Sequence, residues 1–366
     1  MFRRITFLIA IFTLIASSLP AQALHTLDKY VNSTALANPG LIVMDPESGK
    51  VIVENKAESL RVPASVLKLI STSAALHYLG PEKTFSTSIW KTSKSGVFLL
   101  RGNLDPWLTS NSTKAKKNKQ RYLPSLVSKA NISKKKSITL YYYGLYDKDL
   151  SDLKVLLRKQ GIRATTKHIS KEEADAQGKE KVASLTSEPI TTMVSFAILW
   201  SDNALADRLG KAAARKIGNP TTPEGLTKTF VSALDDLGVD SKGLSVEDGS
   251  GLSKANRVSA MTLVSLLGKI RNDARYQSIY DGMPIAGLTG TLVNRFVETA
   301  PNAIGHVHAK TGWVNRSVTM AGYVDDGKHE YVFAILADGI QPTLKARKAA
   351  RAAMDKFLGV IVQGSH

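Results

Sequence analysis

The chain has 366 residues, and 43% of them are hydrophobic, so it is long and apolar enough to bury a sizeable core. It contains no cysteine, which excludes disulfides, thiol catalysis and cysteine-based zinc sites. Its formal net charge of +18 favours association with polyanions.

Residues 1–23 have the pattern of a secretory signal peptide. A basic start is followed by a largely apolar run at residues 5–16 and by an A-x-A site at residues 21–23. The run is too short to span a bilayer comfortably, so we expect cleavage after Ala23 rather than an uncleaved anchor. The protein is then exported to the cell envelope, the periplasm or the outside of the cell. There a polyanionic partner is an envelope polymer or a membrane surface, not nucleic acid.

The first structural signal after this segment is a hairpin that leads into a helix. Strand-like runs at residues 41–44 and 51–53 flank a turn-rich linker. A helix that starts near Pro63 is apolar nearly all round, which indicates a buried central helix. Ser65 and Lys68 are three residues apart and share one face of it. Because burial disfavours a charged ammonium, we expect Lys68 to be the base that activates Ser65.

The same S-x-x-K spacing begins at three other serines, Ser88, Ser133 and Ser151. The first lies in a strand-like stretch, the second in a lysine run and the third at the start of an amphipathic helix. We expect these three to be ordinary solvated residues.

The middle of the chain differs in composition from both ends. Residues 85–184 are rich in Lys and Ser, with strand-like runs at 97–100 and 138–142 and a helix at 150–160. We expect them to form an inserted domain that interrupts a catalytic domain built from residues 24–84 and 185–366.

One stretch of the insert is strongly basic and has no acidic residue. Its positive side chains are Lys114, Lys116, Lys117, Lys119, Arg121, Lys129, Lys134, Lys135 and Lys136. Like charges of this kind favour a polyanionic neighbour, so the stretch is either a contact for anionic cell-wall polymer or simply a solvated loop.

Two further motifs follow the insert. A helical region that begins near Ser187 carries Ser201-Asp202-Asn203, which in isolation is also compatible with a helix cap. Lys310-Thr311-Gly312 precedes two strand-like runs at 318–324 and 331–336 and a closing helix at 344–358. The two ends of the chain therefore predict one antiparallel sheet with helices packed on it.

In this order, S-x-x-K, S-x-N and K-T-G form a known acyl-transfer set of serine enzymes that interact with penicillin. Longer strings resemble one family, the low-molecular-mass class C penicillin-binding proteins, which are D-alanyl-D-alanine carboxypeptidases/endopeptidases. They are P-A-S-V-L-K-L at 63–69, L-R-G-N-L-D-P at 100–106, D-G-S-G-L-S with N-R at 248–257, and P-I-A-G with G-T-L and R at 284–295.

The chain departs from the family pattern in three ways. Leu104 stands where a glycine is usual, and Trp313 stands where the family usually has a small hydroxyl residue. The insert is also shorter than the resemblance suggests, so we expect one extra domain. The change at Trp313 bears on contacts with the substrate.

The resemblance implies an α/β (α+β) fold of the β-lactamase/transpeptidase type, with an antiparallel sheet flanked by helices and interrupted by the insert. It implies peptidoglycan stem peptides as substrates and β-lactam antibiotics as covalent inhibitors. It implies no metal and no organic cofactor.

It also implies roles for the motif residues. Ser65 attacks the carbonyl between two D-alanines, Lys68 accepts its proton, and Ser201 relays that proton to the leaving amine. Asp202 has no part in this chemistry. The remaining roles are assigned as follows: Asn203 holds the substrate backbone, Lys310 and Thr311 bind the terminal carboxylate, Gly312 allows close approach, and the backbone N–H groups of Ser65 and Trp313 form the oxyanion hole.

Two alternatives remain. A serine β-lactamase has the same fold and motifs, but no E-x-x-x-N string lies where a class A enzyme needs its deacylating glutamate. A non-catalytic, basic envelope-binding protein could keep the fold without the activity. Carboxypeptidase and endopeptidase activities use the same acyl-enzyme, so the motifs do not distinguish them.

Overall fold

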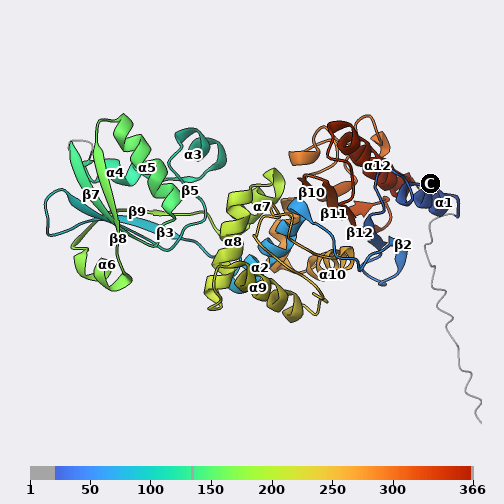
Figure 1. The fold of residues 1–366 in the computed structure, drawn as a ribbon, viewed down its shortest axis with the longest axis horizontal. Coiled ribbons are helices and arrows are strands. Elements are labelled where there is room, and N and C mark those ends of the chain that lie inside the picture. Colours follow the sequence, from blue (N-terminus) through green and yellow to red (C-terminus); the bar gives the residue numbers. More distant parts are fainter. Residues whose placement is uncertain (1–20, 133–135, 364–366) are drawn as a thin grey trace, which may run out of the picture.

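The computed structural model describes residues 21–132 and 136–363, and these contain two five-stranded sheets (Figure 1). The first sheet is antiparallel, with strand order β10-β11-β12-β1-β2. Its strands are β1 (Gly40–Met44), β2 (Val51–Asn55), β10 (Val307–Val314), β11 (Ser317–Asp325) and β12 (Glu330–Ala337). Because β1 pairs with β12, the two predicted hairpins lie in one sheet, which confirms that expectation.

Helices cover both faces of this sheet, as expected for the α+β class. Alternate residues of a strand point to opposite faces. Leu41 and Val43 of β1 therefore pack with α1 (Ala21–Val31) and α12 (Leu344–Gln363), whereas Ile42 packs into the core on the other side. No helix in the described part of the chain is long and apolar enough to cross a bilayer. Residues 1–20 of the expected signal peptide lie outside the described part of the chain, and its last three residues, 21–23, begin α1.

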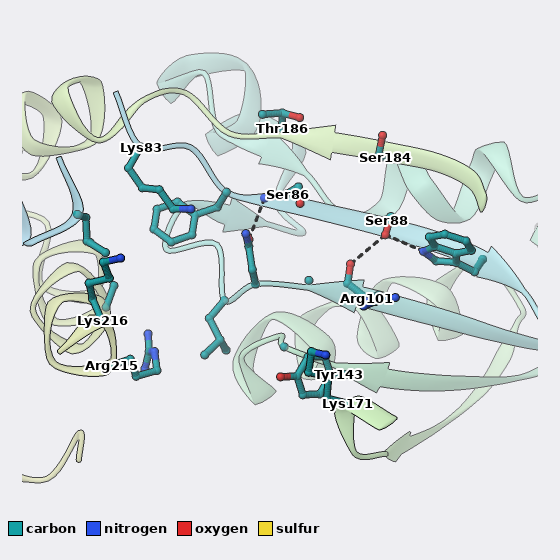
Figure 2. A pocket seen from close by; sticks show the side chains of 18 of the residues that line it. Lys83, Ser86, Ser88, Arg101, Tyr143, Lys171, Ser184, Thr186, Arg215 and Lys216 are labelled. Carbon is teal, nitrogen blue, oxygen red and sulfur yellow. Dashed lines mark hydrogen bonds between the residues drawn. The ribbon is translucent and has the colours of Figure 1, made fainter. Parts of the chain in front are cut away.

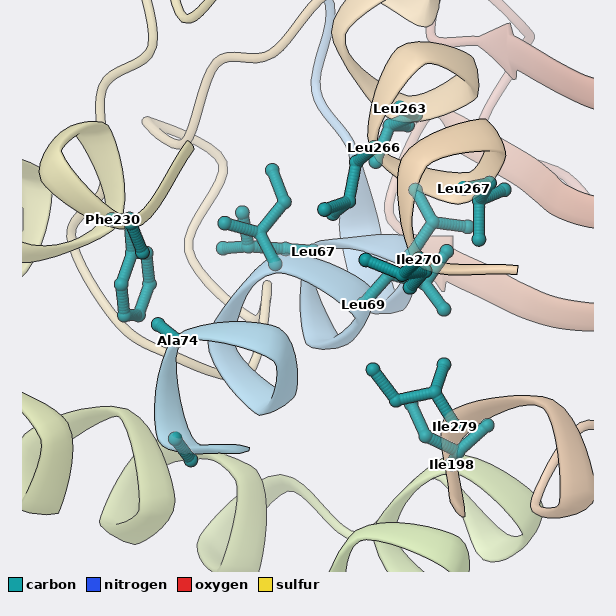
Figure 3. Packing of buried hydrophobic residues seen from close by; sticks show 14 of the residues in the cluster. Leu67, Leu69, Ala74, Ile198, Phe230, Leu263, Leu266, Leu267, Ile270 and Ile279 are labelled. Carbon is teal, nitrogen blue, oxygen red and sulfur yellow. The ribbon is translucent and has the colours of Figure 1, made fainter. Parts of the chain in front are cut away.

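The second core surrounds the helix that follows Pro63. A 3-10 turn, η1 (Ala64–Leu67), continues into α2 (Lys68–Leu79), whose residues are buried as far as Leu76. Its neighbours are α7 (Ile190–Trp200), α8 (Asn203–Lys216), α9 (Pro223–Asp236), α10 (Ala260–Ile270) and α11 (Gln277–Asp281). Figure 3 shows Leu67 and Leu69 of this helix packed toward α10.

Buried hydroxyls in α2 are satisfied within the helix. Thr72 donates to the carbonyl of Lys68 at 2.6 Å, and Ser73 donates to that of Leu69 at 2.7 Å. The helix that carries the S-x-x-K motif is therefore central, as its apolar pattern predicts.

The second sheet is formed by residues between α2 and α7 and has strand order β8-β7-β4-β3-β9. Its strands are β3 (Ser86–Lys91), β4 (Val97–Gly102), β7 (Ser137–Tyr143), β8 (Arg163–His168) and β9 (Glu180–Thr186). The β4–β7 and β7–β8 pairs are parallel, and the others are antiparallel. The helices are α3 (Ser112–Asn118), α4 (Pro124–Lys129), α5 (Asp147–Lys159) and α6 (Lys171–Gln177), and β5 (Leu108–Thr109) pairs with β6 (Arg121–Tyr122). A separate apolar core lies under this sheet.

Helix α8 lies between the two sheet-containing parts and contacts the second of them (Figure 1). Arg208 of α8 forms an ion pair with Asp149 at 3.0 Å, and its guanidinium lies 4.0 Å from the ring centre of Tyr146. Nearby, Leu104 adopts a left-handed conformation with φ +58° at the position where the family usually has glycine. A side chain there costs roughly 1–2 kcal/mol. Its backbone N–H donates to the carbonyl of Gly144 at 2.7 Å, which holds this turn.

Candidate active site

The nucleophile candidate lies at the start of the central helix. Ser65 is partly exposed in the 3-10 turn, and the Lys68 ammonium donates a hydrogen bond to its hydroxyl at 2.9 Å. The preceding residue, Ala64, has φ +48°, a backbone conformation that residues other than glycine rarely adopt. Strain of this kind gathers at functional sites, and here it lies at the residue that positions the hydroxyl.

Lys68 is fully buried, and its ammonium has three partners. Besides Ser65, it donates to the side-chain oxygen of Asn203 at 2.7 Å and to the carbonyl of Ser250 at 2.7 Å. Burial lowers the pKa of Lys68 to about 8, although the carboxylates of Asp248 and Asp202 act in the opposite direction. A lysine with such a pKa is partly neutral near physiological pH and can accept a proton.

A break between two helices presents the second motif. Helix α7 ends at Trp200, and Ser201 follows with φ +57° in the left-handed region. Asp202 then caps α8 by accepting a hydrogen bond from the backbone N–H of Leu205 at 2.9 Å. The helix-cap interpretation therefore applies to Asp202, while Ser201 lines the same cleft as Ser65.

The third motif lies on β10, an edge strand of the sheet. Lys310 is fully buried, and its ammonium donates to the carbonyl of Thr311 at 2.7 Å. Burial, and then the charge of Lys68, lower the pKa of Lys310 well below its usual value. The Thr311 hydroxyl lies 2.7 Å from that of Thr291 at the cleft.

Gly312 brings β10 against the backbone of the nucleophile. A Cβ at this position would lie 2.8 Å from the Ser65 backbone nitrogen and 2.1 Å from the Thr319 hydroxyl. Only glycine therefore allows this strand to lie so close to the 3-10 turn. Trp313 follows directly and is 45% exposed.

The D-G-S-G string forms a loop that contacts Lys68 through a backbone carbonyl. Asp248 accepts hydrogen bonds from the backbone N–H groups of Ser250 and Ser253 at 2.8 and 2.7 Å. Burial raises the pKa of Asp248, but hydrogen bonds from the Ser250 hydroxyl, from these two N–H groups and from the Asn256 amide outweigh it, so the pKa falls to about 2. The ordered loop presents the Ser250 carbonyl to Lys68, a backbone role that no side-chain pattern could indicate.

At least one residue of each motif lines a cleft of about 350 Å³, whereas Lys68, Asn203 and Lys310 are not part of its lining. It is lined by Ser65, Ser201, Thr291, Asn294, Arg295, Thr311, Gly312, Trp313 and Arg351. Arg351 could not be identified from the sequence, because it lies on α12, well after the last motif, and only tertiary packing brings it here. The competing serines Ser88 and Ser151 lie in β3 and α5 and do not line this cleft, whereas Ser133 is outside the described residues.

A second cleft, of about 710 Å³, lies between the second sheet and the end of α8 (Figure 2). Six basic side chains line it together with Phe85, Trp90 and Tyr143, and its lining includes no Asp or Glu. The basic residues are Lys83, Arg101, Lys171, Lys181, Arg215 and Lys216. Asp175 pairs with two of them, Arg101 and Lys171, from outside the lining. Among the described residues, no three His, Asp or Glu side chains gather as metal ligands would.

The sheet covered by helices and the Ser–Lys pair at the start of a buried helix define a class of protein, the serine acyl-transferases that carry these three motifs. The model of the D-Ala-D-Ala carboxypeptidase 3 (S13) family matches residues 23–139 and 128–360, and the chain belongs to this family.

Relatives of known name agree with this assignment. The chain is 26% identical over 382 residues to carboxypeptidase DacB of Mycolicibacterium smegmatis, covering 89% of this chain and 83% of the relative. It is 35% identical over 171 residues to a D-alanyl-D-alanine carboxypeptidase of an Actinomadura species, covering 45% of this chain and 31% of the relative. The fold resembles that of penicillin binding protein 4 from Haemophilus influenzae, with a TM-score of 0.72, 18% identity and coverage of 91% and 98% of the two chains.

Proposed function

We propose that this protein is a serine D-Ala-D-Ala carboxypeptidase that acts on peptidoglycan stem peptides through an acyl-enzyme. Endopeptidase activity on cross-linked peptides would use the same site and the same acyl-enzyme. The observation that carries the proposal is the 2.9 Å contact between the buried Lys68 ammonium nitrogen and the Ser65 hydroxyl. Family membership supplies the reaction class.

The chemistry begins with the neutral form of Lys68. It accepts the hydroxyl proton as the Ser65 oxygen attacks the carbonyl carbon between the two D-alanines. The proton then passes by way of Ser201 to the departing amine as the C–N bond breaks. Water attacks the resulting ester, and Ser65 regains its proton as the shortened peptide leaves.

The other motif residues bind and orient the substrate. Asn203 fixes Lys68 through its side-chain oxygen, which leaves its amide N–H groups for the substrate backbone. Thr311 offers a hydroxyl on the carboxylate side, and Lys310 lies buried beneath it. The backbone N–H groups of Ser65 and Trp313 are the proposed oxyanion donors, and the close approach of Gly312 to Ser65 supports this pairing.

Product analysis tests the proposal. The purified protein should release D-alanine from a pentapeptide stem ending in D-Ala-D-Ala, and a cross-linked dimer assayed in parallel measures the endopeptidase activity. Ser65→Ala should abolish both, because no nucleophile remains. Ser151→Ala is the matched control, since it alters an S-x-x-K serine in α5 and should keep full activity. Release by Ser65→Ala, or no release by the wild type from either substrate, would overturn the proposal.

β-Lactam antibiotics are the proposed covalent inhibitors at the same serine. A β-lactamase would hydrolyse nitrocefin rapidly, whereas a carboxypeptidase of this kind should remain acylated for minutes. A protein that is never labelled by penicillin would be the non-catalytic envelope-binding alternative.

We infer that the protein is exported by way of a signal peptide at residues 1–23. The supporting pattern is the basic start, the apolar run and the A-x-A site, and the proposed substrate lies in the envelope. The mature protein purified from the native cell should begin at Leu24. An N-terminus at Met1 in the exported protein would show an uncleaved anchor.

Binding to anionic wall polymer is a second candidate function. We place it at the basic cleft of Figure 2 rather than at the lysine stretch noted in the sequence. Lys83, Lys181 and Lys216 approach the cleft from separate elements, so a polyanion there would contact several cations at once. Of the stretch noted in the sequence, Lys114, Lys116 and Lys117 lie on α3, whereas Lys134 and Lys135 are outside the described residues.

Sedimentation with purified cell walls tests this candidate. Replacing Lys83, Lys181 and Lys216 by Met should weaken wall binding, and binding should fall steeply as salt rises above physiological strength. Replacing Lys114, Lys116 and Lys117 by Met is the matched control, and it shows whether α3 contributes to wall binding besides the cleft. Binding that persists in high salt, or in both triple variants, would contradict the proposal.

A further inference from the structure

Helix α12 brings an arginine to the cleft that holds Ser65. Arg351 lines this cleft together with Thr311, and one turn earlier Arg347 lies 3.5 Å above the ring of Trp313. The cleft wall beyond Gly312 therefore contains the indole of Trp313, with Arg347 stacked on it, and the guanidinium of Arg351.

The charges on this wall are not balanced. Arg295 also faces the cleft, but its guanidinium is bound to Asp355, with an Nε–O distance of 3.0 Å. Thr299 donates to the same carboxylate at 2.9 Å, so Asp355 is already engaged. Across the described residues, the Arg351 guanidinium has no hydrogen-bond or ion-pair partner. Burial, followed by the charges of Arg295 and Arg347, lowers the pKa of Arg351 from its usual value, although the carboxylate of Asp355 acts in the opposite direction.

Lys310 has a different environment. It is fully buried and already donates to the carbonyl of Thr311, whereas Arg351 is only partly buried and borders the open cleft. A partly desolvated guanidinium without an acceptor is costly, and a bound anion would remove that cost. The fork of an arginine matches a carboxylate with two parallel hydrogen bonds.

We propose that Arg351 binds the carboxylate of the leaving residue, with Arg347 held against Trp313 to keep the wall positive. This inference rests on the proposed function and deepens it, because it assigns the selection of a free C-terminal carboxylate to α12. Thr311 contributes a hydroxyl to the same carboxylate. Lys310 is buried outside the cleft lining, so its charge acts on the carboxylate without direct contact.

Two peptides separate this role from a structural one. They share one sequence ending in D-Ala-D-Ala, and one has a free carboxylate whereas the other has a C-terminal amide. Arg351→Met should lower kcat/KM for the acid by about 10- to 100-fold, the range for a charge-assisted hydrogen bond, and change that for the amide by less than about twofold. The preference of the wild type for the acid should shrink accordingly.

Two further variants complete the experiment. Lys348→Met removes a cation from an exposed position of α12 and should leave both rates unchanged. Arg351→Lys keeps the charge but loses the two parallel N–H donors, so it should retain part of the preference for the acid over the amide. It serves as the test if Arg351→Met folds poorly. An equal loss for both peptides, or no loss for the acid, would overturn the proposal. If the wild type cleaves neither peptide, the proposed function itself has failed and the inference fails with it.

Discussion

The protonation state of one residue, Lys68, governs the proposed chemistry. Its pKa is lowered to about 8 by burial, and only the neutral form can accept the Ser65 proton. The neutral fraction increases as pH rises through this value. The second-order rate of acylation by penicillin should therefore rise between pH 6 and pH 9 with a midpoint near 8. A rate that is flat or that falls over this range would show that neutral Lys68 is not the base.

Asp105 lies near the contact with α8 and should make the folded state less stable as pH rises. An ordinary paired carboxylate, whose pKa is lowered, has the opposite effect. Burial raises its pKa to about 7, so the folded protein binds a proton that the unfolded chain has lost above about pH 4. Stability from this residue is then present at low pH and is lost as pH rises toward 7.

Replacing this residue by its neutral isostere tests the point. Asp105→Asn keeps an oxygen for the backbone N–H of Trp107, which now donates to Asp105 at 2.8 Å. At pH 8 it should raise the free energy of unfolding by more than about 1.4 kcal/mol, the equivalent of one pKa unit. The gain should shrink toward pH 4, as measured by urea unfolding at each pH. A gain that does not vary with pH, or a loss at pH 8, would contradict this account.

At the scale of elements, the packing of β10 against the 3-10 turn forms the site. Gly312→Ala would place a methyl group 2.8 Å from the Ser65 backbone nitrogen and push the strand away. Acylation should fall by about 100-fold or more, the usual effect of losing one oxyanion donor. Gly268→Ala is the control, because its Cβ would meet only Pro46, at 3.7 Å. Normal acylation by Gly312→Ala would mean that this contact is not needed.

Elements with a strong local pattern could be predicted from the sequence. The apolar run after Pro63 predicted the buried helix, and the two turn-rich linkers predicted the hairpins. The end of α7 could not be predicted in this way, because its apolar run continues to Trp200 without a breaker. No local pattern indicates the left-handed conformation of Ser201, and only tertiary packing brings Arg351 to the cleft.

At the scale of the whole molecule, we propose that residues 85–184 act as an inserted domain that contacts α8 of the rest. Composition suggested the insert, but its strand order, with two parallel pairs, depends on crossovers that short strand-like runs do not specify. The contact through Arg208 could not be predicted from the sequence either, because its partner Asp149 is 59 residues away.

The ion pair at this contact provides a test of the arrangement. Asp149 is buried, so Arg208→Met would leave its carboxylate without a partner and should cost about 3–5 kcal/mol in urea unfolding. Adding Asp149→Asn to this variant should restore a large part of the loss. If Arg208→Met costs less than about 0.5 kcal/mol, the two parts are not coupled through this pair.

The central claim is that Ser65 is the nucleophile, and mass spectrometry of the protein after incubation with penicillin tests it most directly. The intact mass should increase by one penicillin molecule, and digestion should place the adduct on the peptide that contains Ser65 and Lys68. Ser65→Ala should show no increase although it keeps the wild-type melting temperature. An adduct on a peptide containing Ser88, Ser133 or Ser151, or an adduct that persists in Ser65→Ala, would contradict the account.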